Sequence, residues 1–193
     1  MKLTVRNATL KRNVANKLTL FYYRTEDSEA DIILQTDGGC LVNDKEKFNK
    51  SPCAAGFYVY NAHLNHFLRN KCYGFYFIDK TNNEVEYIAV IEALKYIVEY
   101  GKKFSGLIIE IYSDSQLIVN QSMGVWKVND SNLYSYCDNV KKLIKEIKSY
   151  GSKISLIWMP RECNIADDIC NKVMRTRNNI NGDLLSKCVL GDK

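Results

Sequence analysis

The stretch Asp31-Ile32-Ile33-Leu34-Gln35-Thr36-Asp37-Gly38-Gly39-Cys40 decides how the rest of the chain is interpreted. Its apolar residues are typical of a buried strand, and the strand runs into a carboxylate that is followed at once by two glycines. Glycine lets the backbone turn away and lets a ligand approach it closely. An aspartate before glycine is also common in turns, so Asp37 alone does not identify a functional site. Its meaning depends on acidic residues further along the chain.

The composition is that of an ordinary globular domain. The chain has 193 residues, of which 46% are hydrophobic and 25% are charged, which is enough for one domain with a full core. No apolar run approaches the roughly 20 residues that span a bilayer, and the first residues contain no secretory apolar region. We therefore expect a monomeric intracellular protein of the cytoplasm or nucleus, with no membrane contact and with no protein partner that the sequence identifies.

The seven cysteines are scattered and include no Cys-x-x-Cys pair. An odd number with that spacing argues against a disulfide framework and against a zinc ribbon. We therefore expect reduced thiols in apolar positions, in a reducing compartment. His63 and His66 lie near Cys72, but two histidines in a turn between strands are more typical of a surface than of a zinc site.

The net charge of +5 and the pI near 8.7 suit a protein that meets polyanions. The basic residues fall in two clusters, one of which lies in residues 1–25, where no acidic residue occurs. Two basic surfaces beside an acidic site fit a nucleic-acid groove, although both clusters also fit ordinary solvated faces. The clusters consist of Lys2, Arg6, Lys11, Arg12, Lys17 and Arg24, and of Lys141, Lys142, Lys145 and Lys148.

Hydrophobic periodicity predicts three strands, a helix, a strand, two helices, a strand and a last helix. The segment Thr81-Asn82-Asn83-Glu84 is a capping box, and apolar residues then repeat at helical spacing until Gly101. The segment 107–114 repeats the opening design, because its apolar strand also ends on an aspartate. Residues 1–30 are predicted to be a basic extension with a possible strand or hairpin, and residues 177–193 a polar, loosely ordered tail.

Acidic residues recur at the ends of these elements. If the strands that end at Asp37 and Asp114 are parallel neighbours, their carboxyl ends bring both carboxylates to the edge where open α/β sheets bind ligands. Glu86 begins the long helix, and Asp167 or Asp168 begins the last one. Clustered carboxylates repel one another, so their proximity needs a cation. Oxygen ligands favour Mg²⁺ or Mn²⁺, and four of them suit a pair of ions that acts on phosphodiesters.

The acidic residues lie in four segments, which are Thr36-Asp37-Gly38-Gly39-Cys40, Thr81-Asn82-Asn83-Glu84-Val85-Glu86-Tyr87, Tyr112-Ser113-Asp114-Ser115-Gln116 and Pro160-Arg161-Glu162-Cys163-Asn164-Ile165-Ala166-Asp167-Asp168-Ile169-Cys170. In this order and spacing they resemble the successive motifs of type 1 ribonuclease H over residues 31–176. The missing basic insertion after Gly124-Val125-Trp126-Lys127 resembles the compact archaeal and plant-like branch. No histidine occurs in the loop before the last helix, where some members carry one.

The resemblance implies an α/β ribonuclease H-like fold, with a five-stranded mixed sheet of order 3-2-1-4-5 flanked by helices. It also implies metal-dependent cleavage of the RNA strand of RNA–DNA hybrids, leaving 5′-phosphate and 3′-hydroxyl. Two Mg²⁺ ions, for which Mn²⁺ substitutes, would be bridged by Asp37, with Glu86 and Asp114 completing one and the last-helix aspartate holding the other.

Contacts with the hybrid are also implied by the resemblance. The minor groove would meet Asn83 and Gln116, with Asn82 near by. RNA 2′-hydroxyls, which distinguish RNA from DNA, would approach the backbone at Gly39 and Cys40. A phosphate contact would fall to Lys127, although an exposed lysine explains that position equally well.

The fourth acid stays open between two residues. Counting four positions from Asn164 gives Asp168. Helical phase favours Asp167, because the packing positions two and three residues later are then the apolar Ile169 and Cys170.

The function is likewise open to alternatives. One is a non-catalytic nucleic-acid-binding subunit of the same fold. The other is a different nuclease on that fold, an exonuclease or a junction resolvase, although such exonucleases usually open with Asp-x-Glu and here Asp37 is followed by Gly38-Gly39.

Overall fold

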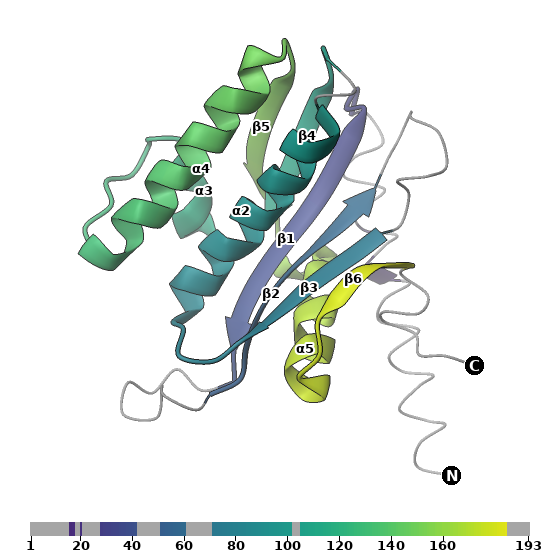
Figure 1. Ribbon diagram of the computed structural model, residues 1–193, viewed down its shortest axis with the longest axis vertical. Helices are drawn as coiled ribbons and strands as arrows, with labels where there is room; N and C mark the ends of the chain where they lie inside the picture. Colours follow the sequence, from purple (N-terminus) through teal and green to yellow (C-terminus); the bar gives the residue numbers. More distant parts are fainter. Residues whose placement is uncertain are drawn as a thin grey trace.

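A six-stranded mixed sheet forms the centre of the computed structural model (Figure 1), which describes residues 16–17, 20, 28–41, 51–60, 71–101 and 105–184. The order of strands across the sheet is β5-β4-β1-β2-β3-β6. The strands are β1 (Ile32–Cys40), β2 (Cys53–Tyr60), β3 (Lys71–Phe77), β4 (Ile108–Ser113), β5 (Lys153–Trp158) and β6 (Ile180–Leu184).

The register of β1 positions the acidic residues. β1 pairs antiparallel with β2, and on its other side it pairs parallel with β4, up to the pair Thr36 and Ser113. Asp37 and Asp114 each follow one member of this last pair. Because parallel strands end at the same edge of a sheet, both carboxylates reach the edge that the sequence predicted.

Helices cover both faces of the sheet (Figure 1). On one face, α2 (Asn82–Gly101) packs against β1 and β2, and α4 (Ser131–Ser149) packs against α2. α5 (Ala166–Thr176) covers β1, β2 and β3, and in Figure 1 it lies on the face opposite α2. The short α3 (Gln116–Ser122) follows β4, and the 3-10 turn η2 (Arg161–Cys163) leads into α5. Two separate apolar clusters, one beneath α2 and α4 and one beneath α5, make up most of the core.

The capping box forms as predicted at the start of α2. The backbone N–H of Glu84 donates to Thr81 Oγ1 at 3.2 Å, and the N–H of Thr81 donates to Glu84 Oε2 at 2.8 Å. Together these bonds satisfy two amides that a helix start leaves without a partner. Because Glu86 follows two residues later, this cap fixes where its side chain leaves the helix.

The sheet differs from the five-stranded prediction by one strand. The predicted order 3-2-1-4-5 is present, but β6 adds to the free edge of β3. The prediction of a loosely ordered tail is therefore wrong for residues 180–184. The polar side chains of β6 give no periodic apolar pattern from which a strand could be predicted. The strand forms all the same, because the free edge of β3 supplies main-chain hydrogen-bond partners whatever the side chains are.

Other predictions fall partly outside the described residues. The strand or hairpin predicted near residues 17–23 is described only at 17 and 20, and both residues are helical, as is residue 16. Lys17 there forms ion pairs with Asp167 and Asp168 on α5. His63 and His66 lie outside the described residues. Among the described helices, none is long and apolar enough to cross a membrane.

The cysteines follow the prediction only in part. Cys40, the last residue of β1, and Cys53, the first of β2, form a disulfide. This corrects the expectation of reduced thiols throughout, because the register places these two residues directly opposite each other. Four other cysteines are buried thiols, as predicted, and Cys188 lies outside the described residues; the four are Cys72, Cys137, Cys163 and Cys170.

Candidate functional site

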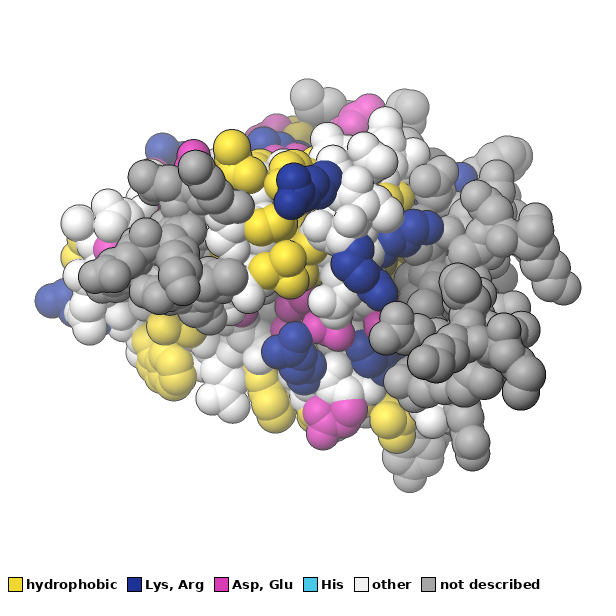
Figure 2. Space-filling view, turned by 90° about the horizontal axis from the view of Figure 1, so that it is seen from below, with side chains coloured by type: hydrophobic (Ala, Val, Ile, Leu, Met, Phe, Trp, Pro, Cys, Tyr) yellow, Lys and Arg dark blue, Asp and Glu magenta, His cyan; other side chains and the backbone are white. Residues whose placement is uncertain are grey.

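Four predicted acids line one cavity of about 450 Å³ at the edge where β1 and β4 end. They are Asp37, Glu86, Asp114 and Asp167. Figure 2, which views the molecule from below, shows acidic side chains near the centre of this face with Lys and Arg side chains around them. The structure therefore brings together one acid from each of the four predicted positions.

Gly38 makes the meeting of β1 and α2 possible. A Cβ on this residue would lie 2.5 Å from the carbonyl oxygen of Val85 and closer still to the nitrogen of Glu86. Only glycine allows this approach, which brings Glu86 next to Asp37. The sequence interpretation assigned both glycines to the approach of a ligand, and both line the cavity. They differ in the space around them, because a Cβ on Gly39 would meet nothing nearer than Met174 at 3.8 Å.

Asn164 fixes the loop before α5 to the ends of both central strands. Its side-chain amide donates to Asp114 Oδ1 at 3.1 Å and to the carbonyl of Thr36 at 3.0 Å, and its Oδ1 accepts from the N–H of Ala166. The buried Gln35 adds a further bond by accepting from the N–H of Ile165 at 2.7 Å. Sequence reasoning missed these positioning roles, and a polar residue inside the apolar β1 stretch was the signal that pointed to Gln35.

Burial and mutual repulsion raise the pKa of three of the four carboxylates in the cavity. Burial and the neighbouring Asp114, Asp167 and Glu86 raise the pKa of Asp37 well above its usual range. Burial raises the pKa of Glu86 to about 7, and it also raises the pKa of Asp114 despite the hydrogen bond from Asn164. Without a cation, these groups favour protonation because like charges share a desolvated space.

Asp167 differs from its neighbours because two cations engage it. Arg161 donates to its Oδ1 at 2.6 Å, and Lys17 donates to its Oδ2 at 3.1 Å. Burial raises the pKa of Asp167, but these two partners outweigh burial and leave it below the usual value. Asp168 also accepts from Lys17, at 2.9 Å, yet it does not line the cavity. The geometry thus agrees with the phase argument for Asp167, whose role as a ligand stays a prediction.

The donor set fits divalent cations that prefer oxygen. All four groups are carboxylates, and Glu86 Oε2 is buried without a hydrogen-bond partner among the described residues. A buried carboxylate oxygen in that state fits a cation ligand. In the described part of the chain, no three His, Cys, Asp or Glu side chains are already grouped to hold a metal ion. Both oxygens of Asp167 are engaged by Lys17 and Arg161, so a cation there must displace at least one of them.

The predicted substrate residues divide into three sets. Gly39, Cys40 and Asn82 line the cavity, where Asn82 Oδ1 accepts from the N–H of Cys40 at 2.8 Å. Asn83 and Gln116 are exposed and lie outside the cavity lining.

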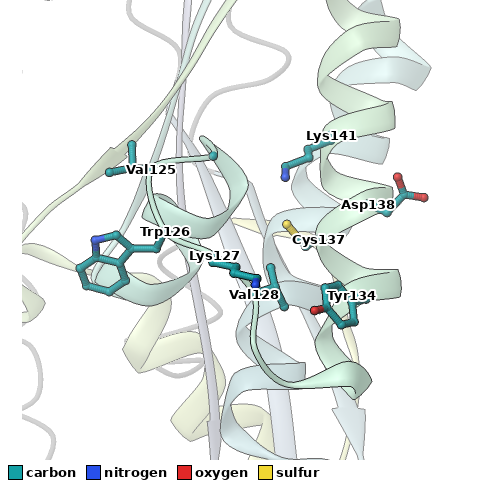
Figure 3. Close-up of a pocket in the computed structure, with 9 residues that line it drawn as sticks. Val125, Trp126, Lys127, Val128, Tyr134, Cys137, Asp138 and Lys141 are labelled. Carbon is teal, nitrogen blue, oxygen red and sulfur yellow. The ribbon is translucent and has the colours of Figure 1, made fainter.

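Lys127 is also exposed and lines a second pocket of about 510 Å³ between the α3–α4 loop and α4 (Figure 3). In that view Trp126 lies apart from Lys141, which projects from α4. The pocket therefore joins basic and aromatic side chains with Asp138, and its lining shares no residue with that of the acidic cavity.

Known proteins resemble this chain in sequence and in structure. It is 33% identical over 69 residues to the uncharacterized protein YpeP of Bacillus subtilis, covering 36% of this chain and 30% of that protein. It is 33% identical over 95 residues to ribonuclease HI of Halobacterium salinarum, covering 49% of this chain and 44% of that protein. The chain thus spans less than half the length of these curated relatives.

The crystal structure of LC11-RNase H1 in complex with RNA/DNA hybrid matches over 76% of this chain and 98% of that chain, with a TM-score of 0.62 and 27% identity. In addition, the sequence model of the family described as RNase H matches residues 29–166, which contain Asp37, Glu86 and Asp114. This match extends over more than half of the sequence. The chain therefore belongs to the RNase H family.

Proposed function

We propose that this protein is a metal-dependent endoribonuclease that hydrolyses the RNA strand of RNA–DNA hybrids and leaves 5′-phosphate and 3′-hydroxyl ends. The observation that carries the proposal is the convergence of four carboxylates on one cavity in a chain of the RNase H family. A solved relative with 27% identity is a complex with an RNA/DNA hybrid, which supports the choice of substrate.

The ions would be held by Asp37, Glu86, Asp114 and Asp167. Two Mg²⁺ ions, or Mn²⁺ in their place, supply Lewis acidity and an activated water when they are bound. The donor chemistry and the unpartnered Glu86 Oε2 support this assignment.

The chain's own residues orient the carboxylates and contact the hybrid. Asn164 holds Asp114 through its amide, so that this carboxylate keeps a fixed direction at the strand end. Gly39 leaves open space at the cavity wall, where a hybrid backbone can lie. Arg161, which also lines the cavity, presents a guanidinium to phosphate oxygens. To Lys127, which is exposed at the second pocket, we assign a contact with phosphates further along the duplex.

The test is cleavage of an end-labelled RNA–DNA hybrid with Mg²⁺ or Mn²⁺, followed by analysis of the product ends. Asp37→Asn and Asp167→Asn are expected to abolish cleavage, since each removes a proposed ligand. Asp168→Asn is the matched control, because it changes the neighbouring carboxylate outside the cavity, and it should retain most of the activity. Hybrid that stays intact with the wild-type protein in both metals refutes the proposal. If the protein still binds that hybrid, the non-catalytic alternative takes its place.

A further inference from the structure

The disulfide between Cys40 and Cys53 lies in the wall of the acidic cavity. Cys40 lines that cavity together with Asp37 and Glu86, whereas Cys53 is completely buried. The two residues face each other across the β1–β2 ladder, with their Cα atoms 4.0 Å apart. Cys40 therefore borders a space that a small reagent can enter, whereas Cys53 is shielded behind it.

The same position also suits two thiols. The carbonyl oxygen of Lys80 lies 3.2 Å from the sulfur of Cys40 and 3.3 Å from the sulfur of Cys53. A thiol donates a hydrogen bond to such an oxygen, but a disulfide has no proton to donate. The carbonyl of Ser51 lies 3.5 Å from the sulfur of Cys53 and offers a second acceptor. Reduction therefore leaves no buried S–H without an acceptor, so both redox states are accommodated.

The pair is connected to residues expected to meet the hybrid. The N–H of Cys40 donates to Asn82 Oδ1, which ties the end of β1 to the first residue of α2. Lys80, whose carbonyl oxygen contacts both sulfurs, also donates through its side chain to Glu84 and to the hydroxyl of Tyr136. These contacts connect the cysteine pair to the start of α2, where Glu86 leaves the helix.

We propose that Cys40 and Cys53 form a reversible thiol–disulfide pair, which exchanges with small disulfides of the glutathione class and changes the affinity of the cavity for the hybrid. The exchange itself stands on the geometry of the pair. Its effect on hybrid binding rests on the function proposed above.

The exchange balances with one small disulfide. The thiolate of Cys40 attacks one sulfur of that disulfide, and one small thiol leaves as a mixed disulfide forms on Cys40. The thiolate of Cys53 then attacks the sulfur of Cys40 and releases the second small thiol. Two electrons pass from the protein pair to the small disulfide, and the two protons end on the released thiols.

The oxidised pair is expected to bind the hybrid more tightly. It joins the end of β1 to the start of β2, so Gly39 and Cys40 lose less conformational freedom when a ligand orders them. Typical coupling between two sites changes an affinity about 5- to 150-fold. Because the disulfide restrains only one loop end, we expect a change in hybrid affinity of about fivefold, at the low end of that range. Reciprocity then requires bound hybrid to make the pair harder to reduce by the same factor.

The first experiment equilibrates the full chain with graded ratios of reduced and oxidised glutathione, traps thiols by alkylation and identifies peptides by mass spectrometry. Reversible appearance of the peptide that joins Cys40 to Cys53 is the expected result. Cys53→Ala should yield at most a mixed disulfide on Cys40, and Cys137→Ala, a buried thiol in the core, should behave as the wild type. A pair that never joins, or that no excess of reduced glutathione opens, overturns the proposal.

The second experiment measures hybrid affinity by fluorescence anisotropy in EDTA, which prevents cleavage, for the oxidised and the reduced protein. The expected result is about fivefold tighter binding by the oxidised form, with no response to redox state in Cys53→Ala. Equal affinities refute the coupling while leaving the proposed function intact. Absence of hybrid binding in both states counts against the proposed function, and the glutathione titration still decides on the pair.

Discussion

Replacement of Gly38 by alanine probes the contact on which the site depends. The residue lies in β1, directly after Asp37, and its missing side chain faces the backbone of α2. A Cβ there would lie 2.5 Å from the oxygen of Val85, whereas carbon and its neighbours normally pack at about 3.5 to 4.0 Å. The obstruction is backbone, which cannot rotate away as a side chain can.

The size of the effect follows from what must move. α2 has to shift by roughly 1 Å or more to restore ordinary contact distances, and it packs against β1, β2 and α4. Overpacking typically costs about 1 to 3 kcal/mol and sometimes more; because the clash involves backbone atoms, we expect at least about 3 kcal/mol. Glu86 moves with the helix, so cleavage should fall together with stability.

Gly39→Ala is the matched control. Its Cβ would meet nothing nearer than the flexible end of Met174 at 3.8 Å, so its free energy of unfolding should stay within about 0.5 kcal/mol of the wild type. Urea denaturation followed by circular dichroism measures both variants. If Gly38→Ala unfolds within that same margin, the close approach of β1 and α2 is not what holds this part of the fold together.

Three further predictions concern charge and hydrogen bonds at the site. In metal-free buffer the free energy of unfolding should fall by about 3 kcal/mol as the pH rises from 4.5 to about 7, because the folded state keeps a proton on Glu86 that the unfolded state releases. Denaturation at stepped pH measures this fall, and Glu86→Gln should make the free energy of unfolding depend less on pH. Lys17→Gln should strengthen Mn²⁺ binding about fivefold by freeing one oxygen of the fourth carboxylate, while Lys95→Gln on an exposed helix surface should not; calorimetric titration that finds the two variants alike contradicts this. Asn164→Ala should cost about 2 to 3 kcal/mol and lower kcat, since Asp114 loses the amide that orients it, and a wild-type kcat in steady-state cleavage would remove that role.

Features set by neighbouring residues were predictable from the sequence. The capping box at Thr81 and Glu84 is a local arrangement, so its pattern was enough to place the start of α2 and therefore Glu86. The apolar runs before Asp37 and Asp114 likewise predicted two strand ends, and the parallel pairing of β1 with β4 follows from the order of the elements.

Features that depend on distant residues were not predictable in the same way. Cys40 and Cys53 meet because the ladder between β1 and β2 has a particular register. A count of seven cysteines shows only that at least one of them cannot pair within the chain. β6 forms because β3 offers an unpaired edge, and Arg177 and Gly182 take the left-handed conformation around it. Neither the register nor the edge leaves a periodic signal in the sequence.

The direction of the fourth acid is decided by how α5 packs against the sheet. Ile169 and Cys170 lie against β2 at Gly56, where a Cβ would stand only 3.1 Å and 3.2 Å from their side chains, and the thiol of Cys170 donates to the carbonyl of Asp37. These contacts fix the rotation of the helix about its axis. Since successive residues of a helix are about 100° apart, Asp167 reaches the cavity while Asp168 is turned away from its lining.

That arrangement also explains how a cation can replace Lys17 as the partner of Asp167. The ammonium bridges both carboxylates, at 3.1 Å from Asp167 and 2.9 Å from Asp168. Burial lowers the pKa of Lys17, but these two partners outweigh burial and leave it raised. A divalent ion that takes Asp167 therefore removes only one of the two partners of the lysine. Because Asp168 stays available outside the cavity, Lys17 keeps an ion pair on α5, and the cost of loading the site is smaller than the cost of expelling a buried charge.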